Sequence, residues 1–370
     1  MKRFLLLGLV FLILGAALFA DDAKVMPLRT GRLSLAPSLT YGVTSFDAGG
    51  RRLDNASPLG SGIIKVFNFG AALEYGIISW ITGAVQWAPG INVWSNVDMD
   101  MNLFALSQFG FPSGSSARVY DMGDLFVGAK VQILGKEAPV KTDNFRLAFA
   151  PGVKIPLPGP DFKDQFENLQ NGYMVTVSTM DNHAVGVGLR SYFDYIINDK
   201  FFVNFYNETL FYVTKPDLNK AGLTEYLTSM GVNSNFGPGA VPAGMESSVE
   251  GKVNYGMELT FEFEPTFSTP IADGLLFTTS LPITYKTSSG KKYEFTGSGV
   301  LGDTAVDAIK GALPDGDRSH SLSIDPGVAI MFYKWFIPME FELNYKSPVW
   351  GMNASSNHTF VFIAKVFFKI

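Results

Sequence analysis

Apolar and polar residues alternate one by one along residues 253–267. The odd positions hold Val253, Tyr255, Met257, Leu259, Phe261, Phe263, Pro265 and Phe267, and the even positions hold Asn254, Gly256, Glu258, Thr260, Glu262, Glu264 and Thr266. Because successive side chains of a strand point to opposite faces, this pattern predicts a strand with one wholly apolar face. The alternation alone would look the same in a water-soluble sandwich, where the apolar face is buried in a core.

The same two-residue period recurs along the chain, for example at 125–133, 145–155, 185–195 and 335–346. It predicts twelve strands. Their expected bounds are 31–45, 61–76, 79–92, 122–134, 144–156, 182–197, 199–214, 251–268, 274–287, 320–333, 335–346 and 356–370.

The expected connections alternate in length. Those after the second, sixth, eighth and tenth strands are tight, and 135–143 is moderate, whereas the connections at 46–60, 93–121, 157–181, 215–250 and 288–319 are long. Short turns at one rim and long loops at the other are typical of an outer-membrane barrel. A soluble sandwich gives no reason for such a segregation.

We therefore predict an all-β fold, a transmembrane antiparallel β-barrel of about twelve strands, with fourteen as the alternative if 157–181 contains a hairpin. The chain is 47% hydrophobic and 14% aromatic, and lipid around a barrel would accept that apolar surface. The alternation continues through Phe360, Phe362, Val366 and Phe368 to the last residue, as expected of a closing strand.

The N-terminus is typical of a secretory signal peptide. Lys2 and Arg3 precede an apolar run that ends at Phe19, and acidic residues follow at Asp21 and Asp22. We expect a signal peptide at 1–20, a short periplasmic segment at 21–30 and a single barrel domain at 31–370. The location follows as the bacterial outer membrane, with both termini in the periplasm and the barrel-assembly machinery as a partner during biogenesis.

Net charge and cysteine content exclude some classes of function. Formal net charge is −5, and it becomes −7 without the signal peptide, because Lys2 and Arg3 leave and no acid does. That acidity argues against nucleic acid as a partner. Cysteine is absent, so disulfides and thiolate metal sites are excluded. No motif indicates a cofactor or a metal ion.

Charged residues at the polar positions of the predicted strands should face the lumen. They are Lys130, Arg146, Lys154, Arg190, Asp194, Glu208, Glu258, Glu262, Glu264, Glu340 and Glu342. A selective ion pore would show one sign in a ring. Mixed signs in a narrow lumen favour a network of salt bridges, since buried charges need partners.

Three of the long loops contain apolar residues at helical spacing, which predicts short helices. The residues are Leu103, Leu106 and Phe109 in 93–121, Leu223, Tyr226, Leu227 and Met230 in 215–250, and Val306 and Ile309 in 288–319. One interpretation is an apolar landing site for a ligand above the pore. The other is that these faces pack on each other and close the mouth of the barrel.

Five prolines occupy apolar positions within predicted strands: Pro37, Pro89, Pro151, Pro265 and Pro326. A proline removes one ladder hydrogen bond, so each predicts a bulge, a kink or a local break. These irregularities could open a lateral gap or simply curve the strands.

Three stretches resemble recurrent elements of one family. They are Asp121–Lys130, with its Gly-Asp and Gly-Ala-Lys; Glu74–Ile77; and Pro151–Pro156 with Gly159–Asp161. These resemble outer-membrane barrels associated with phenol degradation of the MetA type, which are related to long-chain fatty-acid transporters. The resemblance, over residues 60–215, implies passage of fatty acids or aromatic compounds. The fatty-acid transporters have a sizeable N-terminal plug, whereas only about ten residues precede the first strand here.

The predicted function is therefore a non-enzymatic outer-membrane channel that passes small apolar molecules by passive diffusion, with membrane lipid and the ligand as partners. A structural or surface-interaction barrel is the first alternative. A lipase-type enzyme is the second, because Asn182-His183, Asn357-His358 and His320-Ser321 could supply a Ser-His-Asn set.

Overall fold

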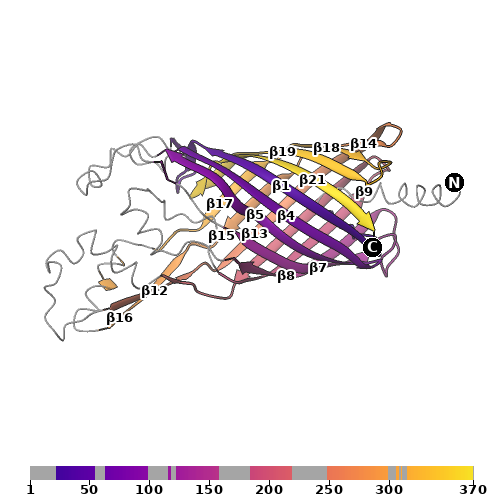
Figure 1. Ribbon diagram of the computed structural model, residues 1–370. Coiled ribbons are helices and arrows are strands. Elements are labelled where there is room, and N and C mark those ends of the chain that lie inside the picture. The colour runs from indigo at the N-terminus through magenta and orange to yellow at the C-terminus, as the bar shows by residue number, and fades with distance from the viewer. Residues whose placement is uncertain are drawn as a thin grey trace.

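The computed structural model describes residues 22–54, 63–98, 116–117, 122–157, 184–218, 248–298, 306–307, 310 and 315–369. These residues form a closed antiparallel barrel whose strands are steeply tilted (Figure 1). Its strands are β1 (Thr30–Gly42), β4 (Ile63–Ile78), β5 (Ile81–Asp98), β7 (Asp124–Leu134), β8 (Phe145–Pro156), β9 (Gly186–Ile196), β10 (Phe201–Tyr212), β13 (Met257–Ala272), β14 (Leu275–Ser280), β15 (Ile283–Ser288), β17 (Ser319–Ile324), β18 (Gly327–Phe332), β19 (Met339–Met352) and β21 (His358–Lys369).

The prediction of twelve strands is confirmed, because β14 and β15 share one position in the ring and β17 and β18 share another. Each strand pairs with its neighbours in the chain. Pairing of β1 with both β4 and β21 then closes the ring. Closure leaves no exposed sheet edge, which is the condition for a strand structure in lipid. Among the described residues, no helix is long and apolar enough to cross a membrane.

The two ends of the barrel differ as predicted. At the turn end, short connections such as 79–80, 197–200 and 273–274 join the strands, and the C-terminus lies there (Figure 1). The opposite end is the loop end. There β11 (Asp217–Leu218), β12 (Ser248–Asn254) and β16 (Lys292–Ser298) form a small sheet that projects beyond the barrel.

Four short strands complete the loop end. β2 (Thr44–Phe46) pairs with both β3 (Arg52–Asp54) and β20 (Ala354–Ser355), and β6 (Ser116–Ala117) pairs with β5. Residues 292–298 were expected to be loop, so that expectation is wrong. Their Tyr-Glu-Phe-Thr alternation is shorter than a barrel strand, and pairing with β12 stabilises it.

Irregular pairing follows a line of prolines across four adjacent strands. Pro265 lies in β13, Pro282 separates β14 from β15, Pro326 separates β17 from β18, and Pro348 lies at a register shift in β19. Carbonyls of three of them accept bonds across the breaks, from Leu281 N at 3.1 Å, Asp325 N at 2.9 Å and Tyr345 N at 3.1 Å. The ladder therefore stays connected where proline cannot donate.

The predicted irregularities at Pro265 and Pro326 are thus confirmed, as is the one at Pro89, where β4 and β5 shift register. Gly90, the next residue, has a positive φ of 84°. At Pro37 and Pro151 the register is the same before and after the proline, so the strand pairing is not shifted there.

The segment before β1 lies inside the barrel at the turn end, with Asp22, Ala23 and Met26 all buried. We expected residues 21–30 to be a periplasmic leader to the first strand. The structure instead places residues 22–26 among inward-facing side chains of the barrel wall, including Thr82 and Asp194.

Candidate functional site: the lumen at the loop end

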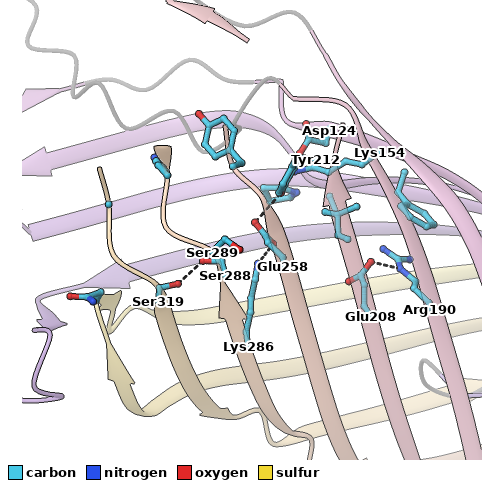
Figure 2. Close-up of a pocket in the computed structure, with 18 of the residues that line it drawn as sticks. Asp124, Lys154, Arg190, Glu208, Tyr212, Glu258, Lys286, Ser288, Ser289 and Ser319 are labelled. Carbon is cyan, nitrogen blue, oxygen red and sulfur yellow. Dashed lines mark hydrogen bonds and ion pairs between the residues drawn. The ribbon is translucent and has the colours of Figure 1, made fainter. Parts of the chain in front are cut away.

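A cavity of about 770 Å³ occupies the part of the lumen nearest the loop end (Figure 2). Strands β7, β8, β9, β10, β13, β15 and β17 contribute to its wall. Because a strand presents alternate side chains to opposite faces, these strands place polar residues in the lumen and apolar residues such as Val187 and Phe261 outside.

A chain of hydrogen bonds and ion pairs crosses the upper wall of the cavity. Asp124 forms an ion pair with Lys154, whose Nζ lies 3.3 Å from the Tyr212 hydroxyl. Tyr212 donates to Glu258 Oε1 at 2.9 Å, and Lys286 Nζ lies 2.7 Å from Glu258 Oε2. The chain links five strands with two cations and two carboxylates, so this tier is balanced in charge (Figure 2).

A second tier lies deeper in the lumen and centres on Arg190. Its Nε lies 2.6 Å from Glu208 Oε1, and its Nη1 lies 2.6 Å from Gln86 Oε1. The guanidinium also lies 3.7 Å from the centroid of the Phe126 ring, a cation–π contact. Tyr206 donates to the other Glu208 oxygen at 3.0 Å. The arginine is therefore fixed by three partners, and Tyr206 in turn holds Glu208.

Further charges pair on other parts of the wall. Arg146 Nε lies 2.6 Å from Asp194, and Lys365 Nζ lies 2.7 Å from Glu340 and 2.6 Å from Glu342. Lys130 donates to the carbonyl of Asp22 at 2.8 Å. The network of mixed charges expected from the sequence is thus what the structure contains.

The remaining predicted lumen charges are Glu262 and Glu264. Glu262 accepts a hydrogen bond of 2.7 Å from the Thr284 hydroxyl. Glu264 is buried and lines a second, much smaller cavity together with Glu340 and Glu342. In the described part of the chain, no group of three or more His, Cys, Asp or Glu side chains could hold a metal ion.

Sequence reasoning omitted several residues that line the cavity. Asp124, Gln86 and Lys286 occupy the same inward alternation as the predicted charges, so the period-two pattern could have identified them. Tyr212, within the predicted strand 199–214, has the same inward alternation. Ser288 and Ser319 lie one residue outside the predicted strands 274–287 and 320–333, so the sequence pattern did not include them.

Of the predicted landing-site residues, Leu103, Leu106, Phe109, Leu223, Tyr226, Leu227, Met230 and Ile309 lie outside the described residues, as do Asn182 and His183. Val306 is described: it is helical and buried. His320 and His358 lie on the outer face near the loop end, with Nδ1 atoms 2.7 Å from the Tyr285 hydroxyl and 2.8 Å from the Tyr345 hydroxyl.

No family model and no curated protein matches the sequence. Among solved structures, an outer membrane channel from Pseudomonas putida F1 matches with a TM-score of 0.58 and 10% identity, over 95% of this chain and 100% of that one. This likeness shows that the chain has the fold of an outer membrane channel.

Two other solved structures align less well. A FadL homologue from Pseudomonas aeruginosa has a TM-score of 0.37 at 10% identity, over 96% of each chain. The toluene transporter TodX of P. putida has a TM-score of 0.35 at 8% identity, over 92% of this chain and 90% of that one. With scores below 0.5, we draw no conclusion from either.

Proposed function

We propose that this chain is an outer-membrane channel through which small molecules with an apolar portion diffuse passively. The observation that supports it most is the cavity of about 770 Å³ in the lumen, a volume typical of sites for small molecules. The fold shared with the P. putida outer membrane channel supports the same class of function.

The lining of the cavity favours amphipathic molecules. Six of its charges are paired within the wall, as Asp124 is with Lys154, Glu208 with Arg190 and Glu258 with Lys286, so they attract neither sign strongly. Between the charged groups lie Phe126, Leu210 and Tyr255, which offer apolar surface. Fatty acids and small aromatic compounds combine an apolar body with at most one polar group, and we propose them as the substrates.

The outer surface supports a place in the outer membrane. Large apolar side chains are exposed on nearly every strand, including Leu73, Val187, Phe261, Leu343 and Phe362. Water would disfavour so wide an apolar surface, whereas lipid accepts it. By analogy with the usual plan of such barrels, we propose that the turn end faces the periplasm and the loop end faces the outside.

Flux through the cavity can be tested by narrowing it. Ser288 lines the cavity, whereas the adjacent Thr287 points outward toward lipid. In vesicles carrying the purified protein, we expect Ser288→Trp to reduce uptake of a labelled medium-chain fatty acid and of a small aromatic severalfold. Thr287→Trp is the matched control and should leave uptake unchanged.

The result also separates the alternatives. Uptake by the unaltered protein no faster than by empty vesicles would favour a structural or surface-interaction barrel. Equal uptake by both tryptophan variants would place the route outside this cavity. A lipase-type role lacks support in the described residues, since His320 and His358 bond to tyrosines rather than to a serine.

A further inference from the structure

The backbone of the N-terminal segment is held by side chains that point into the lumen from the barrel wall. Lys130 Nζ donates to the carbonyl of Asp22 at 2.8 Å, and Gln132 Nε2 donates to the carbonyl of Ala23 at 2.9 Å. The amide of Ala23 donates to both carboxylate oxygens of Asp194 at 3.2 Å. Donors and acceptors of the wall thus match the backbone of the segment, as in recognition of a peptide by main-chain bonds.

Other residues of the wall also hold these side chains. Asp194 is fully buried, and it is held by Arg146 at 2.6 Å and by Asn204 at 2.7 Å. Lys130 is positioned over the ring of Tyr192, with 4.1 Å between Nζ and the ring centroid. A polar group that is already oriented loses little conformational entropy on binding, so this is a preorganised site.

A second set of contacts holds Met26. Its amide donates to Thr82 Oγ1 at 2.7 Å, on β5 next to β7, and its side chain packs in a cluster with Met331 of β18 and Phe367 of β21. Leu276 and Tyr333 flank this cluster. Met26 is 4% exposed, whereas Leu28 is 51% exposed.

Together the contacts come from strands around much of the ring, since Asp194 lies on β9 and Phe367 lies on β21, six strand positions away. Residues 22–26 therefore lie within the lumen at the turn end. Ala23 packs against Ala148, Ala150 and Tyr192, where a larger side chain would not fit. The site accordingly selects a small residue, followed three positions later by a long apolar one.

We propose that the lumen at the turn end is a peptide-binding site, which residues 22–29 of the same chain occupy. Its ligands are peptides that carry a small residue and, three positions later, a methionine-like residue. The proposal does not depend on transport. It also explains why a segment of mixed polarity is buried, since backbone groups of Asp22, Ala23 and Met26 bond to side chains of the wall.

The test releases the segment and offers the same peptide in solution. In the full-length chain, Ala23→Trp with Met26→Ser should expel the segment, so that trypsin cleaves after Lys24 much faster than in the unaltered protein. Folding of the variant is checked by its gel mobility before and after heating. A fluorescent peptide with the sequence of residues 22–29 should then bind this variant at least tenfold more tightly than the unaltered protein, whose site is filled.

Two altered peptides provide the matched comparison. Serine in place of Met26 removes the buried side chain, and we expect at least a tenfold loss of affinity. Serine in place of Leu28 removes an exposed side chain, and the affinity should stay within about twofold. Failure of the peptide to bind the folded variant, or equal losses for the two serine peptides, would overturn the proposal.

A second variant keeps the test decisive if the released chain does not fold. Thr82→Val leaves the segment intact and removes one of its partners on the wall. Loss of one hydrogen bond should speed cleavage after Lys24 about threefold to tenfold. Thr142→Val, in a turn at the same end of the barrel, is the control. Equal cleavage rates in the two variants would show that the wall does not hold the segment.

Discussion

At the scale of single residues, one step along β13 moves a side chain from the outer face to the lumen. Phe261 is 48% exposed on the outside, whereas Glu262 accepts a hydrogen bond from Thr284 inside. Phe261→Arg should destabilise the folded barrel by about 2–4 kcal/mol in lipid, because it places a charge against hydrocarbon. Glu262→Gln keeps the shape and should cost less. Urea titration in vesicles measures both, and equal costs would mean that the face assignment is wrong.

Lys365 offers a second test at this scale. Its side chain is buried between Glu340 and Glu342, at 2.7 Å and 2.6 Å. Lys365→Met removes the cation and leaves two carboxylates without it, so the free energy of unfolding should fall by about 3–5 kcal/mol. Adding Glu340→Gln and Glu342→Gln to that variant should restore part of the loss, as the same urea titration would show.

The pair of Lys334 and Asp273 in neighbouring turns is the exposed counterpart of this network. Both side chains are largely accessible to water, and such pairs contribute about 0–1 kcal/mol. Lys334→Met should therefore have little effect on stability. A loss as large as that of Lys365→Met would show that burial does not govern the strength of these pairs.

The alternation of residues in the sequence was enough to predict which charges face the lumen. Lys130, Arg190 and Glu208 lie at inward positions of strands whose other face is apolar. The partners were not predictable, because Arg190 bonds to Gln86 from a strand more than a hundred residues earlier. Such pairing depends on the register between distant strands, which periodicity within one strand does not specify.

At the scale of elements, the bend in the β4–β5 hairpin depends on Gly90. Its φ of 84° disfavours other residues, and an added Cβ would lie 2.0 Å from the carbonyl oxygen of Phe69. Gly90→Ala should destabilise the barrel by about 1–3 kcal/mol, the usual cost of a strained backbone. Gly49→Ala, in an exposed turn, should be nearly neutral. Thermal unfolding in detergent compares the two, and equal shifts would contradict this account.

Among the elements, the strands could be predicted from the sequence, whereas the position of the N-terminal segment could not. Twelve strands followed from the two-residue period, and the interruptions at Pro265 and Pro326 followed from the missing amide donor. The burial of residues 22–26 did not, because five residues of mixed polarity have no recognisable period. Their place is determined by Thr82, Lys130, Gln132 and Asp194, which are remote in sequence and converge only after the barrel closes.

At the scale of the whole molecule, closure of the ring forms two separate regions of the lumen. The cavity lies toward the loop end, and residues 22–26 lie in the lumen at the turn end. Between them lies the tier around Arg190, whose partners come from three different strands. Both regions require side chains from opposite walls, so neither exists before the barrel is complete.

Closure itself depends on the pairing of β1 with β21, which joins residues 30–41 to residues 358–369. Deleting residues 358–370 would leave β1 and β19 as open edges, whose unpaired backbone groups are costly in lipid. The full-length protein should migrate as a compact band on a denaturing gel until it is heated, because all its strands are paired. The truncated protein should migrate as unfolded with or without heating. Phe336→Ser, at the fully exposed tip of a turn, is the control and should keep the compact band. A compact band from the truncated protein would mean that the ring closes through another pair of strands.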